Sequence, residues 1–321
     1  MLDADTFLTT LYAMADDFCK ANLPAEVRPG PEASLSRSEV VTLAIFGQWV
    51  RFASERDFWR FAQAKLRRAF PKLPDRSQFS RLMRTHHDAI VAFGLSFARA
   101  EADYEALDTL PVTVRQYKRR GRGWLPGQAD IGFSKRIASW FCGFRLLSAV
   151  SPDGLITGFA FGPASAKDQR LADSLLALRQ TPDSRLPSAG AAQAAGCYLA
   201  DKGFEGKNWQ LRWRSDYGVV VLHPPRRNSR HPWPRSLRRW LASLRQPARC
   251  STWASALPRP GIGETVFAKL TQTFRWDRER PHDLAGFRAR LAAKVARHNF
   301  CHWRNRNLGR PALAFADLLG W

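Results

Sequence analysis

Residues 196–206 read GCYLADKGFEG, and this stretch decides how the rest of the chain is interpreted. The apolar run from Cys197 to Ala200 ends abruptly at Asp201, and Lys202, Gly203 and Phe204 follow at once. A buried strand of an α/β sheet has this pattern when its C-terminal end brings a carboxylate to the sheet edge where sites form. Asp201 is therefore the first candidate catalytic residue.

The composition indicates a polyanionic partner. The 321 residues carry a formal net charge of +22, and most of the excess is arginine. Arginine pairs bidentately with phosphates, so we expect nucleic acid as the partner. No uninterrupted apolar stretch of about 18 residues occurs, and the acidic, amphipathic start is unlike a signal peptide. We therefore expect a cytoplasmic, nucleoid-associated protein that makes no membrane contact.

Residues 1–98 are predicted to form an all-α domain. Ser36 and Glu39 have the spacing of a capping box, and apolar residues then recur at helical spacing. A later helix begins after Asp75 and displays a polar face with Arg76, Arg81 and Arg84. Short helices, a proline-containing connection and a last helix that displays arginine are typical of a helix-turn-helix-like DNA reader. The alternative is a helical cap with a solvated basic face.

Histidine and cysteine residues could suggest metal sites. The last helix is predicted from Leu284 to Phe300 and is expected to be amphipathic and basic. His298, Cys301 and His302 lie close together near its end, but no fourth ligand follows at a recognisable spacing. We expect instead that these are helix-end histidines near phosphate. Adjacent histidines such as His86 and His87 point about 100° apart on a helix and are interpreted as structural. The five cysteines form no CxxC pair and are expected to be free thiols.

A helix is predicted from Ala89 to Glu105, and the segment between it and Asp201 predicts strands and a further helix. Residues 104–114 form an apolar strand that contains Asp108, and a lone Asp in such a strand usually caps a turn. Residues 116–136 are rich in Gly, Lys and Arg and are expected to be a phosphate-contacting loop outside the core. A hairpin is predicted around Pro152-Asp153-Gly154. Asp168 opens the next helix, and its presence there is explained by the favourable interaction of an acidic residue with the helix dipole.

Residues 223–263 contain nine arginines, three tryptophans and no acidic residue. Such a run repels itself without a counter-anion, which favours contact with nucleic acid through backbone neutralisation and base stacking. The alternative is a solvated loop whose tryptophans pack on the domain. The candidate DNA contacts in this run and elsewhere in the second half of the chain are Lys202, Arg226, Arg227, Arg238, Arg239, Arg275 and Arg278.

The helix predicted after Gly263 carries the last candidate, Glu264. This residue lies in the first turn at the border of the apolar face, so its carboxylate can point along the sheet edge. An acidic residue in a first turn is also an ordinary consequence of the helix dipole. Glu264 alone would therefore be a weak candidate.

The order of these elements resembles the RNase H-like core of DDE transposases from bacterial insertion sequences. The resemblance is carried by LDTLPVTV, LADKGF and ETVFAKLTQTF followed by FRARLAAKVARHN, and it runs from Tyr104 to Asn299. It implies an α/β fold with a mixed sheet flanked by helices in residues 99–321. The arginine-rich segment 223–263 is then an insertion before the last catalytic helix, and residues 1–98 are the DNA-binding domain.

The resemblance also implies a site and an activity. Asp108, Asp201 and Glu264 would be the catalytic residues and the ligands of two Mg²⁺ ions, for which Mn²⁺ can substitute. Asp108 and Asp201 would share one ion and Glu264 would complete the second site. The implied activity is cutting double-stranded DNA at the terminal inverted repeats and joining those ends to target DNA, by a homodimer without an organic cofactor. Two alternatives remain: a non-catalytic DNA-binding protein derived from a transposase, and a nuclease without strand transfer.

Overall fold

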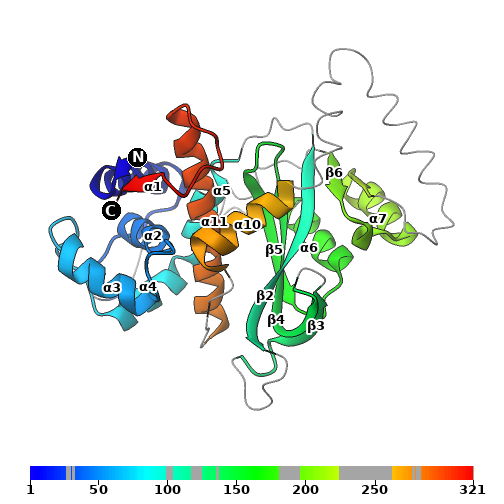
Figure 1. The fold of residues 1–321 in the computed structure, drawn as a ribbon, viewed down its shortest axis with the longest axis horizontal. Helices are drawn as coiled ribbons and strands as arrows, with labels where there is room; N and C mark the ends of the chain where they lie inside the picture. The colour runs from blue at the N-terminus through cyan, green and yellow to red at the C-terminus, as the bar shows by residue number, and fades with distance from the viewer. Residues whose placement is uncertain are drawn as a thin grey trace.

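The computed structural model describes residues 1–26, 30, 33–98, 104–116, 125–134, 137–180, 196–223, 262–276, 279 and 283–320. N-terminal helices lie on one side of the molecule, a mixed sheet lies on the other, and the long helix α11 (Leu284–Asn307) stands between them (Figure 1). The two ends of the described chain lie together because β1 (Leu2–Asp3) pairs in parallel with β8 (Leu319–Gly320). No helix in the described ranges is long and apolar enough to cross a membrane.

The N-terminal helices begin where the sequence marks caps. Ser36 accepts from the Glu39 amide while the Glu39 side chain accepts from the Ser36 amide, so the predicted capping box is confirmed. Asp75 accepts from the Gln78 amide at 2.9 Å and starts the predicted arginine-bearing helix. The elements are α1 (Ala4–Asn22), α2 (Arg37–Phe46), α3 (Glu55–Phe61), a π-helical turn (Ala62–Leu66), α4 (Arg76–Thr85) and α5 (His87–Leu95).

The sheet has the strand order expected of an RNase H-like core. Strand β4 pairs antiparallel with β2 on one edge and with β3 and β5 on the other, and β2, β6 and β7 follow in parallel. The predicted hairpin between β4 and β5 is confirmed, with Gly154 at a φ of 96° in its turn. The strands are β2 (Glu105–Gln116), β3 (Asp130–Ser134), β4 (Ser139–Val150), β5 (Ile156–Pro163), β6 (Cys197–Ala200) and β7 (Val220–Leu222).

Helices cover both faces of the sheet. Helices α6 (Asp168–Gln180) and α7 (Lys207–Tyr217) share a core with Leu107, whereas α10 (Ile262–Phe274) and α11 share a core with Leu110 and Val112. Successive residues of a strand point to opposite faces, so Asp108 belongs to the α10 face and Thr109 to the α6 face. This alternation fixes which helix each polar residue of β2 can contact.

Three expectations about these elements are wrong. The helix predicted to start at Ala89 ends at Leu95 rather than Glu105, because Glu105 is buried at the start of β2. Residues 130–134 of the predicted loop form β3, which pairs with β4. The last helix, expected to be amphipathic and basic, is buried on nearly all sides and extends to Asn307.

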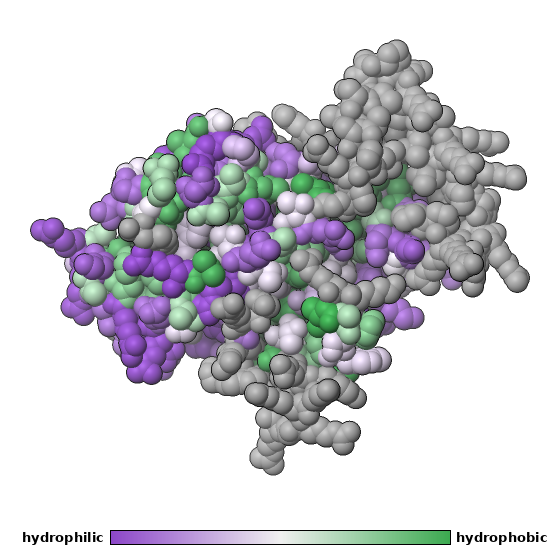
Figure 2. Space-filling view, in the orientation of Figure 1, coloured by the Kyte–Doolittle hydropathy of each residue, from purple (hydrophilic) through white to green (hydrophobic). Residues whose placement is uncertain are grey.

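Buried polar side chains of α11 bond to carbonyl groups of other elements. Arg297, for example, donates to the carbonyls of Ile45 at 2.9 Å and Phe46 at 3.1 Å, and its guanidinium lies 3.8 Å from the Trp49 ring centroid. Helix α11 therefore joins the N-terminal helices to one face of the sheet in a continuous apolar cluster. Hydrophilic residues gather on the outer surface of the N-terminal helices (Figure 2). The domain boundary at residue 98 stays a sequence-based prediction.

Candidate active site

The backbone register of two parallel strands brings Asp108 and Asp201 to one edge of the sheet. Leu107 of β2 pairs with Ala200 of β6, Asp108 is the next residue of β2, and Asp201 is the first residue after β6. Because the two strands are parallel and in register, both aspartates lie at the same edge of the sheet. Asp108 is half-buried and Asp201 is exposed.

The start of α10 packs directly on Asp108. A Cβ added to the buried Gly263 would lie 3.0 Å from Asp108 Cβ and 3.1 Å from its Oδ2, so only a glycine allows this approach without a shift. Val266, Phe267 and Leu270 are buried and hold the helix on the sheet. Glu264 is exposed and follows Gly263 directly in the first turn of α10.

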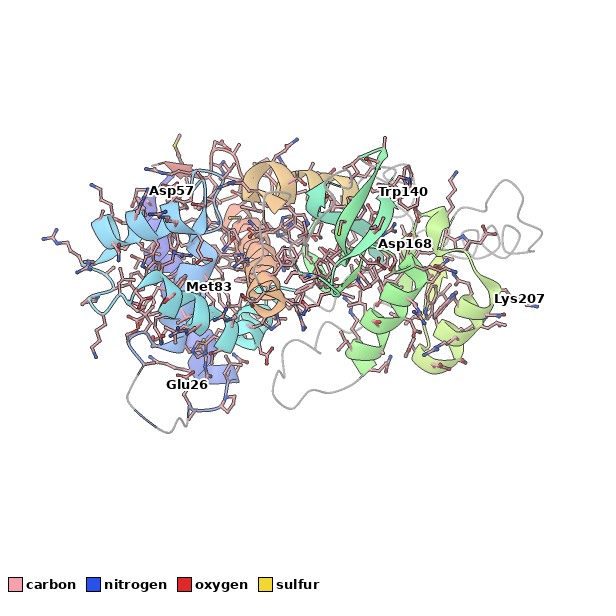
Figure 3. All side chains as sticks on the ribbon, turned by 90° about the horizontal axis from the view of Figure 1, so that it is seen from below. Glu26, Asp57, Met83, Trp140, Asp168 and Lys207 are labelled. Carbon is pink, nitrogen blue, oxygen red and sulfur yellow. The ribbon has the colours of Figure 1, made fainter. Side chains whose placement is uncertain are left out.

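A fourth carboxylate, which sequence reasoning did not select, lies beside Asp201. The Gly203 amide donates to Asp201 Oδ1 at 2.7 Å and thereby closes the turn after β6. A Cβ on Gly203 would lie 2.7 Å from Asp201 Oδ1 and also 2.7 Å from Asp168 Oδ2. Asp168 stands at the start of α6, between that helix and the strands (Figure 3). The carboxylates of Asp168 and Asp201 therefore approach each other over the bare backbone of Gly203.

Asp168 is anchored by the sheet. Its Oδ1 accepts from Arg145 Nη1 at 3.0 Å and from Thr109 Oγ1 at 3.2 Å. Arg145 also donates to the carbonyls of Ala164 and Phe133, at 3.0 and 2.8 Å, so its guanidinium is fixed on three sides. From the sequence alone, Asp168 was interpreted as an acidic residue that the helix dipole favours in a first turn. The signal that could have found it is Arg145, a lone charge within the apolar strand β4.

The donor set at this edge suits a hard divalent cation. Carboxylate oxygens are the ligands that Mg²⁺ and Mn²⁺ prefer. Gly203 and Gly263 approach Asp201 and Asp108 so closely that a Cβ on either glycine would crowd the carboxylate, so bare backbone lies against these donor oxygens. Within the described ranges, no three His, Cys, Asp or Glu side chains already form a group that could hold a metal ion.

The histidine expectation is corrected by the structure. His298 and His302 are buried, and their Nε2 atoms contact the carbonyls of Gly154 at 2.8 Å and Asp153 at 3.0 Å. They hold the β4–β5 turn against α11 and do not face phosphate. Burial lowers the pKa of His298 to about 3 and also lowers the pKa of His302, so both rings are neutral at pH 7. Of the cysteines, the described four are free, as expected.

The predicted DNA contacts occupy different environments. Arg81 is exposed on α4 and donates to Gln78 at 3.3 Å, whereas Arg84 pairs with Asp283 at 3.0 Å. Arg76 lies 3.5 Å from Glu55 and keeps about half of its side chain exposed, at 52%. Lys202 is exposed beside Asp201, and the half-buried Arg275 donates to the Phe52 carbonyl. The contacts predicted at Arg226, Arg227, Arg238, Arg239 and Arg278 lie outside the described residues.

Comparison with known protein families identifies the chain. The model of the transposase DDE domain matches residues 106–300, which is more than half of the chain. Comparisons with curated proteins and with solved structures gave no match. The matched segment starts within β2 and ends within α11, so it contains Asp108, Asp201 and Glu264 together with the sheet that positions them. The chain therefore belongs to the transposase DDE domain family, whose substrate is DNA.

Proposed function

We propose that this protein is an active transposase of a bacterial insertion sequence, which cuts DNA at the element ends and joins those ends to target DNA. One observation carries the proposal. Leu107 pairs with Ala200, so that Asp108 and Asp201 follow at one sheet edge, and the start of α10 packs against Asp108 through Gly263. Membership of the transposase DDE domain family supports the same conclusion.

Backbone amides orient two of the three proposed carboxylates. Asp108 Oδ1 accepts from the Thr109 amide and Asp201 Oδ1 accepts from the Gly203 amide, both at 2.7 Å, so backbone donors orient both groups. In the proposed site these two aspartates would hold one divalent cation together, and Glu264 would contribute to the binding of a second. Bound cations would supply activation of a water or 3′-hydroxyl and stabilisation of the leaving oxygen at a phosphodiester.

The proposed partners follow from charge and from the reaction. A net charge of +22 favours binding to the DNA backbone, and the polar face of α4 is the proposed contact in the N-terminal helices. Joining requires two element ends to be held together, so we propose a homodimer on DNA. The arginine-rich residues 223–263 are proposed to add further phosphate contacts.

The test is a cleavage and joining assay on supercoiled DNA that carries the ends flanking the gene. Wild type is compared with Asp201→Asn in Mg²⁺, in Mn²⁺ and in EDTA. Asp216→Asn is the matched control, because this exposed aspartate on α7 pairs with Arg212 at 3.4 Å. We expect metal-dependent nicks and joined products from wild type and from the control. The nicking rate of Asp201→Asn should be more than about 100-fold below that of wild type. Substitution of residues that only contact metal ligands already lowers metal affinity or activity by roughly 10–100-fold, and Asp201 is proposed as a ligand itself.

The other outcomes separate the alternative functions. DNA binding without metal-dependent cleavage in any variant would overturn the proposal in favour of a non-catalytic DNA-binding protein. Metal-dependent nicks without joined products, with both ends and target DNA present, would indicate a nuclease without strand transfer. Equal cleavage by wild type and Asp201→Asn would remove Asp201 from the site.

A further inference from the structure

We propose that Asp168 is a positioning residue of this site, which orients Asp108 through Thr109 and places a fixed negative charge beside Asp201. The inference rests on the proposed function, because it concerns the cation that Asp108 and Asp201 would bind. It adds a residue from α6 to the three carboxylates from β2, β6 and α10. The first support is the fixed position of Asp168 itself.

Asp168 cannot turn away from the site without losing its partners. Arg145 Nη1 and Thr109 Oγ1 both donate to its Oδ1, and the other Arg145 nitrogens are held by backbone carbonyls. The Asp168 and Arg145 side chains are only 19% and 21% exposed, so solvent screens this pair weakly. The anchored Oδ1 leaves Oδ2 as the oxygen that faces Gly203 and Asp201.

Thr109 connects Asp168 with Asp108. Its side chain donates to Asp168 on the α6 face, and its backbone amide donates to Asp108 Oδ1 at 2.7 Å. One residue therefore contacts both carboxylates, from opposite faces of the same strand. Loss of the Asp168 contact would let the Thr109 side chain rotate and would loosen the peptide that orients Asp108.

Gly203 connects Asp168 with Asp201. The Asp168 Oδ2 and Asp201 Oδ1 atoms each lie 2.7 Å from the position of a Gly203 Cβ, so the two oxygens are close to each other. Arg145 contacts Asp168 through its other oxygen, and two nearby carboxylate charges favour a cation between or beside them. The expected effect of Asp168 is therefore tighter binding of a divalent cation at the Asp201 side of the site.

The experiment measures Mn²⁺ binding by the full chain without DNA, using titration calorimetry, together with thermal unfolding and nicking rate. Asp168→Asn keeps an oxygen for Arg145 and Thr109 but removes the charge that faces Asp201. Asp173→Asn is the matched control, since Asp173 lies on the same helix and pairs with Arg212 at 3.0 Å. We expect Asp168→Asn to raise the Mn²⁺ Kd by about 10–100-fold, as outer partners of metal ligands do. Loss of the ion pair with Arg145 should also lower the Tm, so the Kd is measured at a temperature at which every variant is folded.

Gly203→Ala gives an independent measurement that keeps every charge. Its methyl group would push Asp168 and Asp201 apart, so it too should raise the Mn²⁺ Kd. Excess Mn²⁺ should restore nicking to Asp168→Asn but not to Asp201→Asn, because only Asp201 is a proposed ligand. Wild-type Mn²⁺ affinity in both Asp168→Asn and Gly203→Ala, with cleavage abolished in Asp201→Asn, would overturn this inference alone. Absence of Mn²⁺ binding and cleavage in wild type would overturn the proposed function and this inference together.

Discussion

Gly263 and Asp108 are in contact through backbone and side chain, with no space for a Cβ between them: an added Cβ would lie 3.0 Å from the Asp108 Cβ. Gly263→Ala should therefore displace Asp108 or the start of α10 by a few tenths of an ångström. We expect the metal-dependent nicking rate to fall about 10-fold, which corresponds to about 1.4 kcal/mol in the barrier.

The stability of the same variant provides the control. Alanine is favoured over glycine inside a helix by up to about 1 kcal/mol, which offsets the strain of the new contact. The Tm of Gly263→Ala should consequently stay close to the wild-type value. If activity and Tm fell together in proportion, the contact would be explained as packing alone, and the catalytic placement of Glu264 would lose its main support.

The buried ion pair between Glu105 and Arg179 should make the fold sensitive to the loss of either partner alone. Their side chains are 3% and 4% exposed, and Arg179 also donates to Tyr198 at 2.5 Å and to Thr157 at 3.1 Å. Burial opposes the charge on Arg179, but Glu105 and Tyr198 raise its pKa above the usual value. Arg179→Met would leave Glu105 buried without its partner, so the free energy of unfolding should fall by about 3–5 kcal/mol in urea titrations.

Two further variants identify the cause of that loss. The double variant Glu105→Leu with Arg179→Met removes both charges and should recover most of the stability, because paired removal leaves no isolated buried charge. Lys20→Ala removes an exposed partner of Asp16 and should leave the unfolding free energy unchanged within error. A double variant as unstable as Arg179→Met would show that the residues act by shape rather than by charge.

The candidate site could be predicted in part because its signals are local. Asp201 ends an apolar run, and Glu264 opens a patterned helix, so each is marked within a few residues. The register in which Leu107 pairs with Ala200 is set by contacts between distant strands, and no pattern in the neighbouring sequence indicates it. Asp168 was missed for the same reason, since its partner Arg145 lies 23 residues earlier in the chain.

The burial of α11 could not be predicted from its composition. Lys294 and His298 have charged or polar side chains that favour a solvated face, yet both are buried. Lys294 donates to the carbonyl of Phe274 in a different helix and pairs with Glu279 at 3.0 Å, and His298 Nε2 contacts the carbonyl of Gly154 in a hairpin turn. Polar groups are tolerated in a core when such partners satisfy them, and these partners become apparent only in the folded chain.

Buried histidines predict a loss of stability in mild acid. Burial, with smaller contributions from His302 and Lys269, lowers the pKa of His298 to about 3 in the folded chain. In the unfolded chain His298 takes up a proton below about pH 6.5, whereas in the folded chain it stays neutral. The free energy of unfolding is therefore unaffected by this group above about pH 6.5 and falls progressively as the pH is lowered toward 3. Below about pH 6 the free energy of unfolding should fall by about 1.4 kcal/mol per pH unit for this group.

The measurement compares thermal unfolding of wild type and His298→Gln between pH 8 and pH 5. Glutamine keeps an amide N–H that can donate to the Gly154 carbonyl but has no proton to gain in this range. The variant should show a flatter dependence of stability on pH than wild type. Carboxylates with lowered pKa, such as Glu279, lose their contribution only at lower pH and do not obscure the comparison. Parallel curves for the two proteins would show that His298 does not titrate on unfolding.

The arginines of α4 differ in how strongly the fold already engages them, and this difference predicts their effect on DNA binding. Arg81 is exposed, donates to the neutral Gln78 and has only a minor electrostatic interaction with Asp75, whereas the exposed Arg212 pairs directly with Asp173 and Asp216. A phosphate contact by Arg81 would release about one counterion. Arg81→Ala should therefore reduce the slope of log affinity against log salt by about 1.

Binding is measured with element-end DNA across a range of salt concentrations. Arg212→Ala is the control, because carboxylates already balance its charge and its removal should leave the slope nearly unchanged. Arg81→Lys should retain the slope if Arg81 meets a phosphate, since lysine also releases a counterion. Loss of discrimination between end and unrelated DNA in Arg81→Lys, at an unchanged slope, would instead indicate a base contact, because lysine lacks the planar fork of arginine. Slopes identical to wild type in Arg81→Ala would exclude α4 from the DNA interface at this position.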